Sequence, residues 1–163
     1  MHPGVLSLEE VMERFAREKR NGKKVVFTNG CFYLLHPGHV QLLETARNLG
    51  DFLVVGLNDD ESLSALKGSY RPLIPAEERA EIIASLECVD AVVIFHEMTP
   101  QKLIAALLPD ILVKGADWPS DQIVGRKEVE ETGGRVELIP IVRGFSTTAI
   151  LKKMRGEKTE IGE

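Results

Sequence analysis

The chain has 163 residues, 44% hydrophobic and 28% charged, which is typical of one soluble globular domain with its own core. Its net charge of −5 argues against partners such as nucleic acid or a membrane surface, because proteins that bind them usually carry a basic patch. No apolar run approaches the roughly 20 residues of a membrane helix, and the N-terminus lacks a signal-peptide pattern. With only two cysteines, Cys31 and Cys88, the sequence indicates a cytoplasmic chain with reduced thiols.

Helical and strand-forming segments alternate along the chain. Ser7 and Glu10 have the spacing of a capping box, which predicts a first helix over 8–20. Further helices are predicted over 37–49, a short segment from 60, 75–86, 99–108, 120–132 and 147–155. Strands are predicted over 24–28, 52–57, 89–95, 111–114 and 135–139.

Five strands that alternate with helices predict an α/β fold, a doubly wound five-stranded parallel sheet. The strands are short and apolar on both faces, as expected when helices cover both sides of a sheet. No repeat, low-complexity segment or linker interrupts the pattern. We therefore expect a single domain over 1–155, with the helix of residues 1–22 packed on it and a polar tail over 156–163.

Ligands of open α/β sheets bind outside the carboxyl ends of the strands. The unusual polar residues of this chain fall at those ends, and the opposite edge has no comparable cluster. These segments are 29–39 after the first strand, Asn58, Asp59 and 67–71 after the second, 114–117 after the fourth, and 143–148 after the fifth. The sequence thus predicts a functional site at one edge of the sheet.

The first of these segments is the most informative. An apolar strand runs into the turn Asn29-Gly30, and His36-Pro37-Gly38-His39 follows at the predicted start of a helix. Such a strand–turn–helix junction directs backbone N–H groups and the positive end of the helix dipole to one place. We expect an anion there, and the two imidazoles beside it suggest phosphate chemistry.

Each feature also has a simpler interpretation. The two histidines could be half of a zinc site, but zinc needs two further ligands and neither cysteine has a clear partner. Lys67 and Arg71 could be solvated surface charges, and Lys114-Gly115 only a strand end. Ser146 could serve only as a helix N-cap. The occurrence of all these features at one edge favours a functional site over chance.

Five stretches together resemble the nucleotidyltransferase superfamily with the H-x-G-H motif. They are TNGCF at 28–32, LLHPGHV at 34–40, LKGSYRP at 66–72, LPDILVKGADW at 108–118 and FSTTAIL at 145–151. The sequence is most similar to the D-glycero-D-manno-heptose 1-phosphate adenylyltransferases, which are domains of ADP-heptose synthases or separate chains. The resemblance runs from about Leu8 to Met154 and implies a Rossmann-like nucleotidyltransferase fold.

The resemblance implies adenylyl transfer from ATP to a heptose 1-phosphate, which gives ADP-heptose and pyrophosphate for surface polysaccharide or lipopolysaccharide precursors. With no preceding kinase segment in the sequence, we expect another protein to supply the sugar phosphate. Mg²⁺ is expected with ATP, held mainly by the phosphates and with no protein metal site. We also expect a homodimer, because small domains of this fold often pair.

The resemblance also assigns roles to individual residues. His36, His39 and Lys114 would be catalytic, stabilising charge on the phosphates. Tyr33, Asn58, Lys67 and Arg71 would contact the sugar phosphate. The nucleotide would be bound by Thr28, Asn29, Gly30, Cys31, Phe32, His36, Gly38, His39, Lys114, Gly115, Asp117, Ser146, Thr147 and Thr148. Because a phosphomonoester is already mostly ionised at neutral pH, this chemistry needs donors and cations and no strong general base.

One position departs from the family pattern. Where the family usually reads N-G-C-F-D, this chain has Tyr33 in place of the aspartate. Either Tyr33 packs and leaves the loop unchanged, or it alters the sugar site and weakens catalysis.

Two other functions stay open at the level of sequence. Cytidylyl transfer to a polyol phosphate such as glycerol 3-phosphate would use the same mechanism, but its loop usually begins T-Y-G-T-F. A nucleotide-binding module that has lost activity would account for Tyr33. The intact His36, His39 and Lys114 argue against that second alternative.

Overall fold

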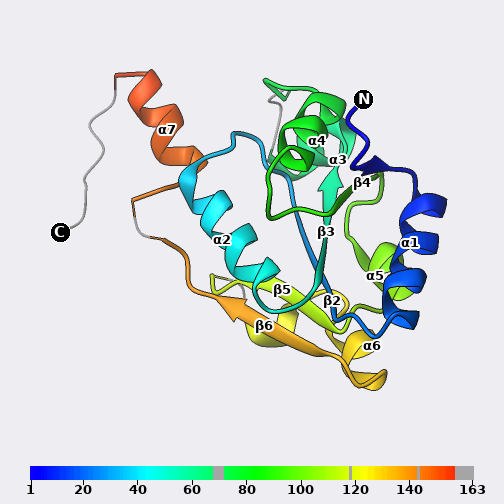
Figure 1. The fold of residues 1–163 in the computed structure, drawn as a ribbon. Helices are drawn as coiled ribbons and strands as arrows, with labels where there is room; N and C mark the ends of the chain where they lie inside the picture. The colour runs from blue at the N-terminus through cyan, green and yellow to red at the C-terminus, as the bar shows by residue number, and fades with distance from the viewer. Residues whose placement is uncertain (68–71, 118, 143, 157–163) are drawn as a thin grey trace.

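The computed structural model describes residues 1–67, 72–117, 119–142 and 144–156 (Figure 1). The predicted α/β fold is confirmed: a parallel sheet lies between two layers of helices. The strands are β1 Val5–Leu6, β2 Val25–Gly30, β3 Phe52–Asn58, β4 Ala91–Phe95, β5 Ile111–Gly115 and β6 Arg135–Ile139. The helices are α1 Leu8–Arg20, α2 Pro37–Arg47, α3 Asp60–Lys67, α4 Ala76–Ala84, α5 Gln101–Leu107, the 3₁₀ turn η1 Ser120–Gln122, α6 Arg126–Glu131 and α7 Thr147–Met154.

The sheet has six strands in the order β1-β4-β3-β2-β5-β6, so the prediction of five strands was wrong by one. The additional strand, β1, has only two residues, and Val5 and Leu6 align with Val92 and Val93 of β4. Two residues are too few to show the alternation of polar and apolar side chains that predicts a strand, so only the pairing with β4 defines this one.

The predicted helix over 120–132 is also corrected. It is divided into η1 and α6, because Gly125 between them has φ +86° and cannot continue a right-handed helix. The capping box at the start of α1 is confirmed: Ser7 Oγ accepts from the Glu10 N–H at 3.2 Å, and Glu10 Oε2 accepts from the Ser7 N–H at 2.8 Å.

Two apolar cores cover the two faces of the sheet. Successive residues of a strand point to opposite faces, so Val25 and Phe27 contact one core and Val26 contacts the other. The first core includes residues of α1, α5 and α6, and the second includes residues of α2 and α4. Because β3 is central, all seven of its residues are buried.

The topology brings the functional segments together. The chain leaves β2 towards β3 and β4, then crosses back to β5 on the other side of β2. The strand order therefore reverses beside β2, and ligands of doubly wound sheets bind at such a point. None of the helices in the described part of the chain is both long and apolar enough to cross a bilayer.

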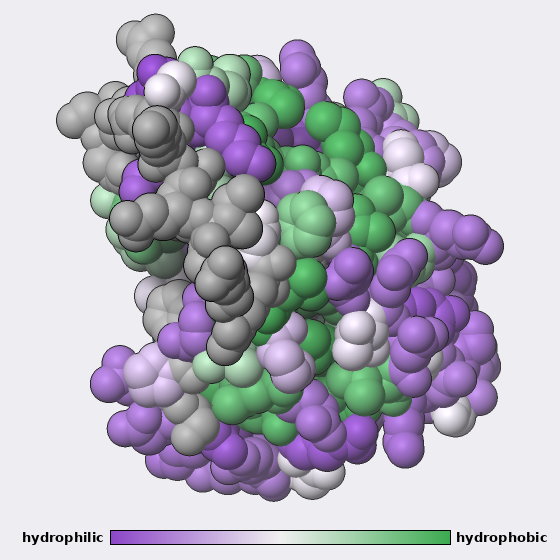
Figure 2. Space-filling model, turned by 90° about the vertical axis from the view of Figure 1, so that its left-hand side faces the viewer, coloured by the Kyte–Doolittle hydropathy of each residue, from purple (hydrophilic) through white to green (hydrophobic). Residues whose placement is uncertain are grey.

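The C-terminal helix α7 extends away from the sheet (Figure 1), and none of its residues is buried. Ile141 and Phe145 before it and Met154 at its end are exposed. Figure 2, seen from this side of the molecule, shows hydrophobic surface between hydrophilic margins.

Two glycines allow a test of the break before α6. Gly125 and Gly133 have nearly the same dihedral, φ +86° and +85°, but a Cβ on Gly125 would lie 2.6 Å from Ile104 Cγ2, whereas Gly133 has nothing within 4 Å. We expect Gly133→Ala to lower the free energy of unfolding by about 1 kcal/mol through backbone strain alone. Gly125→Ala should cost about 1–3 kcal/mol more through overpacking. Urea unfolding of both variants measures the difference, and equal losses would contradict the packing argument.

Candidate functional site

Lys114 and Asn29 meet where β5 and β2 end. The register pairs Thr28 with Val113, which brings the next residue of each strand into contact, and Lys114 Nζ donates to Asn29 Oδ1. Burial lowers the pKa of Lys114 to about 8. Within the described ranges no carboxylate forms an ion pair with this ammonium group. The site thus holds a partly desolvated cation that an anionic ligand would stabilise.

His36 and His39 stack on one another at the start of α2. Their ring centroids are 3.7 Å apart with an interplanar angle of 21°, and the His36 N–H donates to His39 Nδ1 at 3.4 Å. Burial, followed by the proximity of His36, lowers the pKa of His39 to about 4, and burial also lowers the pKa of His36. Nδ1 of His36 is buried and, in the described part of the chain, has no hydrogen-bond partner. Both rings are therefore neutral near pH 7, and His36 keeps one buried ring nitrogen that is unsatisfied within the described residues.

The loop between β2 and α2 is held in an unusual conformation. Phe32 has φ +43°, which is rare for a bulky residue, and its side chain is only 7% exposed. Its ring packs against His39 with centroids 5.1 Å apart. A Cβ on Gly30 would lie 3.1 Å from the Phe32 ring, so Gly30 leaves room for this packing. Through the ring of Phe32, the strained loop thus packs against His39 of the histidine pair.

The start of α7 lies beside the histidine pair. A Cβ on Gly38 would be 3.1 Å from the His36 ring and 3.2 Å from Phe145 Cβ, so Gly38 permits the close approach of these two residues. Ser146 Oγ accepts from the Ala149 N–H at 3.0 Å, which confirms the predicted N-cap. Thr147 and Thr148 form the first turn of this helix. The N-termini of α2 and α7 thus come together, although their residues are far apart in the sequence.

Arg79 of α4 connects the ends of β2 and β3, and the sequence analysis missed it. The residue is 2% exposed. Its Nη1 donates to the carbonyls of Cys31 at 2.6 Å and Asn58 at 3.0 Å, and its Nη2 pairs with Asp60 Oδ1 at 2.7 Å. Its Nε donates to the Ile74 carbonyl at 3.0 Å. A signal for it exists in the sequence. Arg79 stands on the buried side of α4, together with Ala76, Ala80 and Ile83, and a charged residue at such a position must have partners.

The remaining predicted residues lie in different environments. Cys31 Sγ is 3.7 Å from Asn58 Oδ1, so these two residues do come together. Thr28 is buried and donates from Oγ1 to the Val113 carbonyl at 3.0 Å, which joins β2 to β5. The hydroxyl proton of Thr28 is therefore already used in a hydrogen bond within the sheet. Nucleotide binding by Thr28 stays a prediction.

Asp117 follows β5 and is exposed. A Cβ on Gly115 would lie 2.8 Å from Asp117 Oδ1, so Gly115 leaves room for this carboxylate. Arg71 and the side chain of Lys67 lie outside the described residues.

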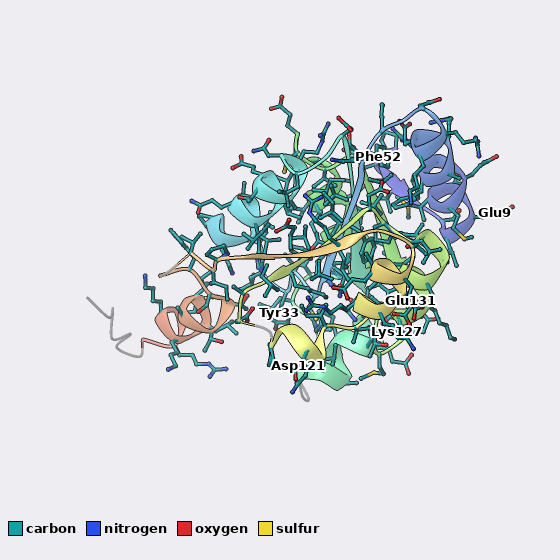
Figure 3. All side chains as sticks on the ribbon, turned by 90° about the horizontal axis from the view of Figure 1, so that it is seen from below. Glu9, Tyr33, Phe52, Asp121, Lys127 and Glu131 are labelled. Carbon is teal, nitrogen blue, oxygen red and sulfur yellow. The ribbon has the colours of Figure 1, made fainter. Side chains whose placement is uncertain are left out.

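Tyr33 is buried, with 9% of its surface exposed. It comes three residues after the end of β2 and hence near the carboxyl edge of the sheet, and Figure 3 shows it apart from Phe52, the first residue of β3. The burial favours the interpretation that Tyr33 packs as part of the loop.

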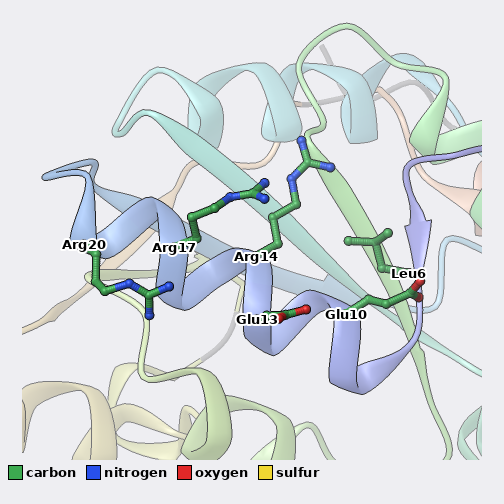
Figure 4. A pocket seen from close by; sticks show the side chains of 6 residues that line it. All are labelled: Leu6, Glu10, Glu13, Arg14, Arg17 and Arg20. Atoms are coloured by element: carbon green, nitrogen blue, oxygen red, sulfur yellow. The ribbon is translucent and has the colours of Figure 1, made fainter.

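A groove of about 300 Å³ lies elsewhere, along α1 (Figure 4). It is lined by Leu6 and by both acidic and basic residues: Glu10, Glu13, Arg14, Arg17 and Arg20. The Arg14 guanidinium lies 5.2 Å from the centroid of the Phe52 ring, which indicates a packing role. Because this groove is near the beginning of β3, it is not part of the cluster at the carboxyl edge.

Comparison with known proteins agrees with the geometry at this edge. The family model described as Cytidylyltransferase-like matches residues 27–159. The chain belongs to this family. It is a nucleotidyltransferase, and the matched region contains every residue of the cluster at the carboxyl edge.

Among curated proteins, the "Bifunctional protein HldE" of Citrifermentans bemidjiense is 57% identical over 150 residues, 92% of this chain but 31% of that protein. The chain thus spans about a third of the length of the curated relatives it matches. A solved lipopolysaccharide core biosynthesis protein from Thermoplasma volcanium is 29% identical with TM-score 0.60, covering 74% of this chain and 98% of that one. Pantothenate synthetase from Thermus thermophilus, 19% identical with TM-score 0.58 and covering 85% of this chain and 62% of its own, shares the fold.

The contacts of Arg79 predict a large loss on its removal. Arg79→Met leaves three backbone carbonyls and Asp60 without their donor, and we expect the free energy of unfolding to fall by about 3 kcal/mol. Arg135→Met is the matched control, because Arg135 pairs with Glu137 at 2.7 Å on the surface with half of its side chain exposed. That control should cost less than about 1 kcal/mol. Similar losses in the two variants, measured by urea unfolding, would show that the Arg79 contacts contribute little.

The lowered pKa of His39 predicts a pH dependence of stability. Between pH 6.5 and about 4 the unfolded chain binds a proton at His39 and the folded chain does not, so the free energy of unfolding falls as the pH falls through this window. Above pH 6.5 both states are neutral at His39, and its contribution no longer changes. His39→Gln should flatten this slope, because glutamine binds no proton in either state. The same slope in wild type and in His39→Gln, measured by denaturant unfolding at several pH values, would contradict the burial of a neutral His39.

Proposed function

We propose that the protein is an adenylyltransferase that joins ATP and a heptose 1-phosphate, giving ADP-heptose and pyrophosphate. The observation that carries the proposal is the pair of stacked, neutral imidazoles at the start of α2, with the unpartnered Nδ1 of His36 near the start of α7. At the end of β5, in contact with Asn29, lies the buried ammonium of Lys114. A cation together with imidazole and backbone donors is suited to binding a polyphosphate.

In the proposed reaction, an oxygen of the sugar phosphate attacks the α-phosphorus of ATP. A new P–O bond forms, and the bond from the α-phosphorus to the bridging oxygen of the β-phosphate breaks. Pyrophosphate leaves with the electron pair of that bond. Because the attacking phosphate is already ionised, no proton has to be removed by the protein.

The protein would contribute position and charge. The incoming phosphates would raise the pKa values of His36 and His39, so that each imidazole becomes a stronger donor when the substrate is present. Lys114, with its pKa near 8, would keep its charge beside the phosphates. Asn29 would hold Lys114 in place through the hydrogen bond at the end of β2. Together these groups would stabilise the charge that develops in the transition state.

The beginning of α7 would bind the outer phosphates of ATP. Ser146 caps the helix, and the hydroxyls of Thr147 and Thr148 accompany the N–H groups of its first turn. These donors and the positive end of the helix dipole favour a phosphate at this position. Cys31 and Asn58 lie on the opposite side of the loop, so the sugar phosphate would approach from β3.

Mg²⁺ would accompany ATP. The phosphates would carry the ion, because Mg²⁺ in such sites keeps several waters and takes few protein ligands. When bound, the ion would neutralise charge on the leaving pyrophosphate. A homodimer stays a prediction.

The test is pyrophosphate release, measured with ATP, CTP and GTP and with a panel of heptose, hexose and polyol phosphates. We expect the highest kcat/KM with ATP and a heptose 1-phosphate. His36→Ala should lower kcat by about 10²- to 10³-fold, because it removes one stabilising donor. His2→Ala is the control. A preference for CTP and glycerol 3-phosphate would replace the proposal with the polyol alternative, and full activity of His36→Ala would overturn the catalytic assignment.

Substitution of Tyr33 distinguishes an active enzyme from a nucleotide-binding module with weakened catalysis. If the missing aspartate limits catalysis, Tyr33→Asp will raise kcat above that of the unmodified chain. Equal rates would leave Tyr33 a packing residue, as its burial favours. No release with any substrate pair, combined with retained ATP binding, would favour the module.

A further inference from the structure

His96 is an exposed imidazole with a fixed orientation. It follows the last residue of β4, and its Nδ1 is 2.8 Å from Asp59 Oδ2, which belongs to the segment after β3. The His96 side chain is 80% exposed, whereas that of Asp59 is 15% exposed. A mostly buried carboxylate therefore holds one nitrogen of a solvent-exposed ring.

The carboxylate itself cannot easily rotate. Asp59 Oδ1 accepts from the Ser62 N–H at 2.8 Å, and the Asp59 N–H donates to the Phe95 carbonyl at 3.1 Å. The contact with Asp59 favours the tautomer that has its proton on Nδ1, which leaves Nε2 of His96 as an acceptor facing solvent. An exposed pair of this kind contributes at most about 1 kcal/mol to stability, so stability alone gives little reason for such precise support.

The position of His96 relates it to the proposed reaction centre. Cys31, Asn58 and Asp59 form a continuous path from the end of β2 to the end of β3, and His96 extends it past β4. Adjacent strands are about 4.8 Å apart, so the ends of β2 and β4 are separated by roughly 10 Å. Lys114 and Ser146 occupy the opposite side, beyond β2. If ATP binds on that side, the acceptor sugar extends over β3 towards β4.

We propose that His96, oriented by Asp59, accepts a hydrogen bond from a hydroxyl of the acceptor sugar at the end remote from its phosphate. The inference rests on the proposed function and adds a residue that selects the sugar. A seven-carbon sugar extends roughly 8 Å from its phosphate, judged from covalent bond lengths, which brings its remote hydroxyls near the end of β4. His96 is then a substrate-binding residue, and Asp59 is a positioning residue that acts through it.

The chemistry favours discrimination between sugars. A site built to bond a hydroxyl rejects analogues without it, because its own polar group is then left unpaired. A shorter sugar phosphate would leave Nε2 of His96 in water and gain nothing from it. Substitution of His96 should thus weaken the binding of the longer acceptor sugar and leave the binding of ATP unchanged.

The experiment compares steady-state kinetics of wild type, His96→Ala, His96→Gln and Asp59→Asn. With a heptose 1-phosphate, His96→Ala should lower kcat/KM by about 10- to 100-fold, mainly through KM, while KM for ATP stays constant. With a hexose 1-phosphate, wild type and His96→Ala should differ by less than about twofold, because the remote hydroxyl is absent. His96→Gln should recover part of the loss, and Asp59→Asn should show a smaller loss of the same kind.

Lys102→Ala is the matched control, because Lys102 is an exposed residue that pairs with Glu97 next to His96, with 81% of its side chain exposed. Unchanged kinetics of His96→Ala with the heptose, or equal losses with both sugars, would overturn the inference and leave the proposed function intact. A wild type without product from any acceptor would defeat the proposed function. Calorimetry of heptose 1-phosphate binding would then decide the inference separately: equal affinities of wild type and His96→Ala would overturn it.

Discussion

The buried guanidinium of Arg79 determines the geometry on which the site depends. It hydrogen-bonds the carbonyl that follows β2 and the carbonyl at the end of β3, and it pairs with Asp60 at the start of α3. These carbonyls lie beyond the regular pairing of the sheet, where backbone acceptors would otherwise need water. One side chain from α4 thus fixes the separation of two strand ends and with it the beginning of the loop that carries the histidines.

The cluster at the carboxyl edge is arranged to receive charge. His39 is kept neutral by burial and by its neighbour His36, and the ammonium of Lys114 is partly desolvated beside the neutral Asn29. In a chain whose net charge is −5, two nearby carboxylates are already paired: Asp59 with His96 and Asp60 with Arg79. Within the described residues Lys114 bonds the neutral Asn29 and forms no ion pair, so an anion that enters the site would not have to displace a carboxylate from it.

Much of the fold could be predicted from local sequence patterns. Each strand from β2 to β5 contains an apolar run, β6 alternates charged and apolar residues, and the capping box at Ser7, the prolines and the glycines mark most helix ends within about two residues. The errors have physical causes. β1 is too short to show a period and exists only because β4 offers a pairing edge. The helix expected over 120–132 is interrupted at Gly125, which has a positive φ that glycine adopts readily and which leaves no room for a Cβ beside Ile104.

For the site, the sequence by itself determined which residue types stand at the strand ends, because strand direction and the parallel topology follow from the alternation of apolar runs and helices. It also determined the pair His36 and His39 at the start of a helix, since Pro37 and the following apolar residues specify that start. Only the tertiary structure decided which of these groups meet. The stacking of the two rings, the approach of Phe145 to Gly38 and the contact of Lys114 with Asn29 depend on strand register and on close packing between distant segments. The contacts of Arg79 with Cys31 and Asp60 and the pair of His96 and Asp59 emerge at the same level, because these partners lie 19 to 48 residues apart and no local pattern encodes such contacts.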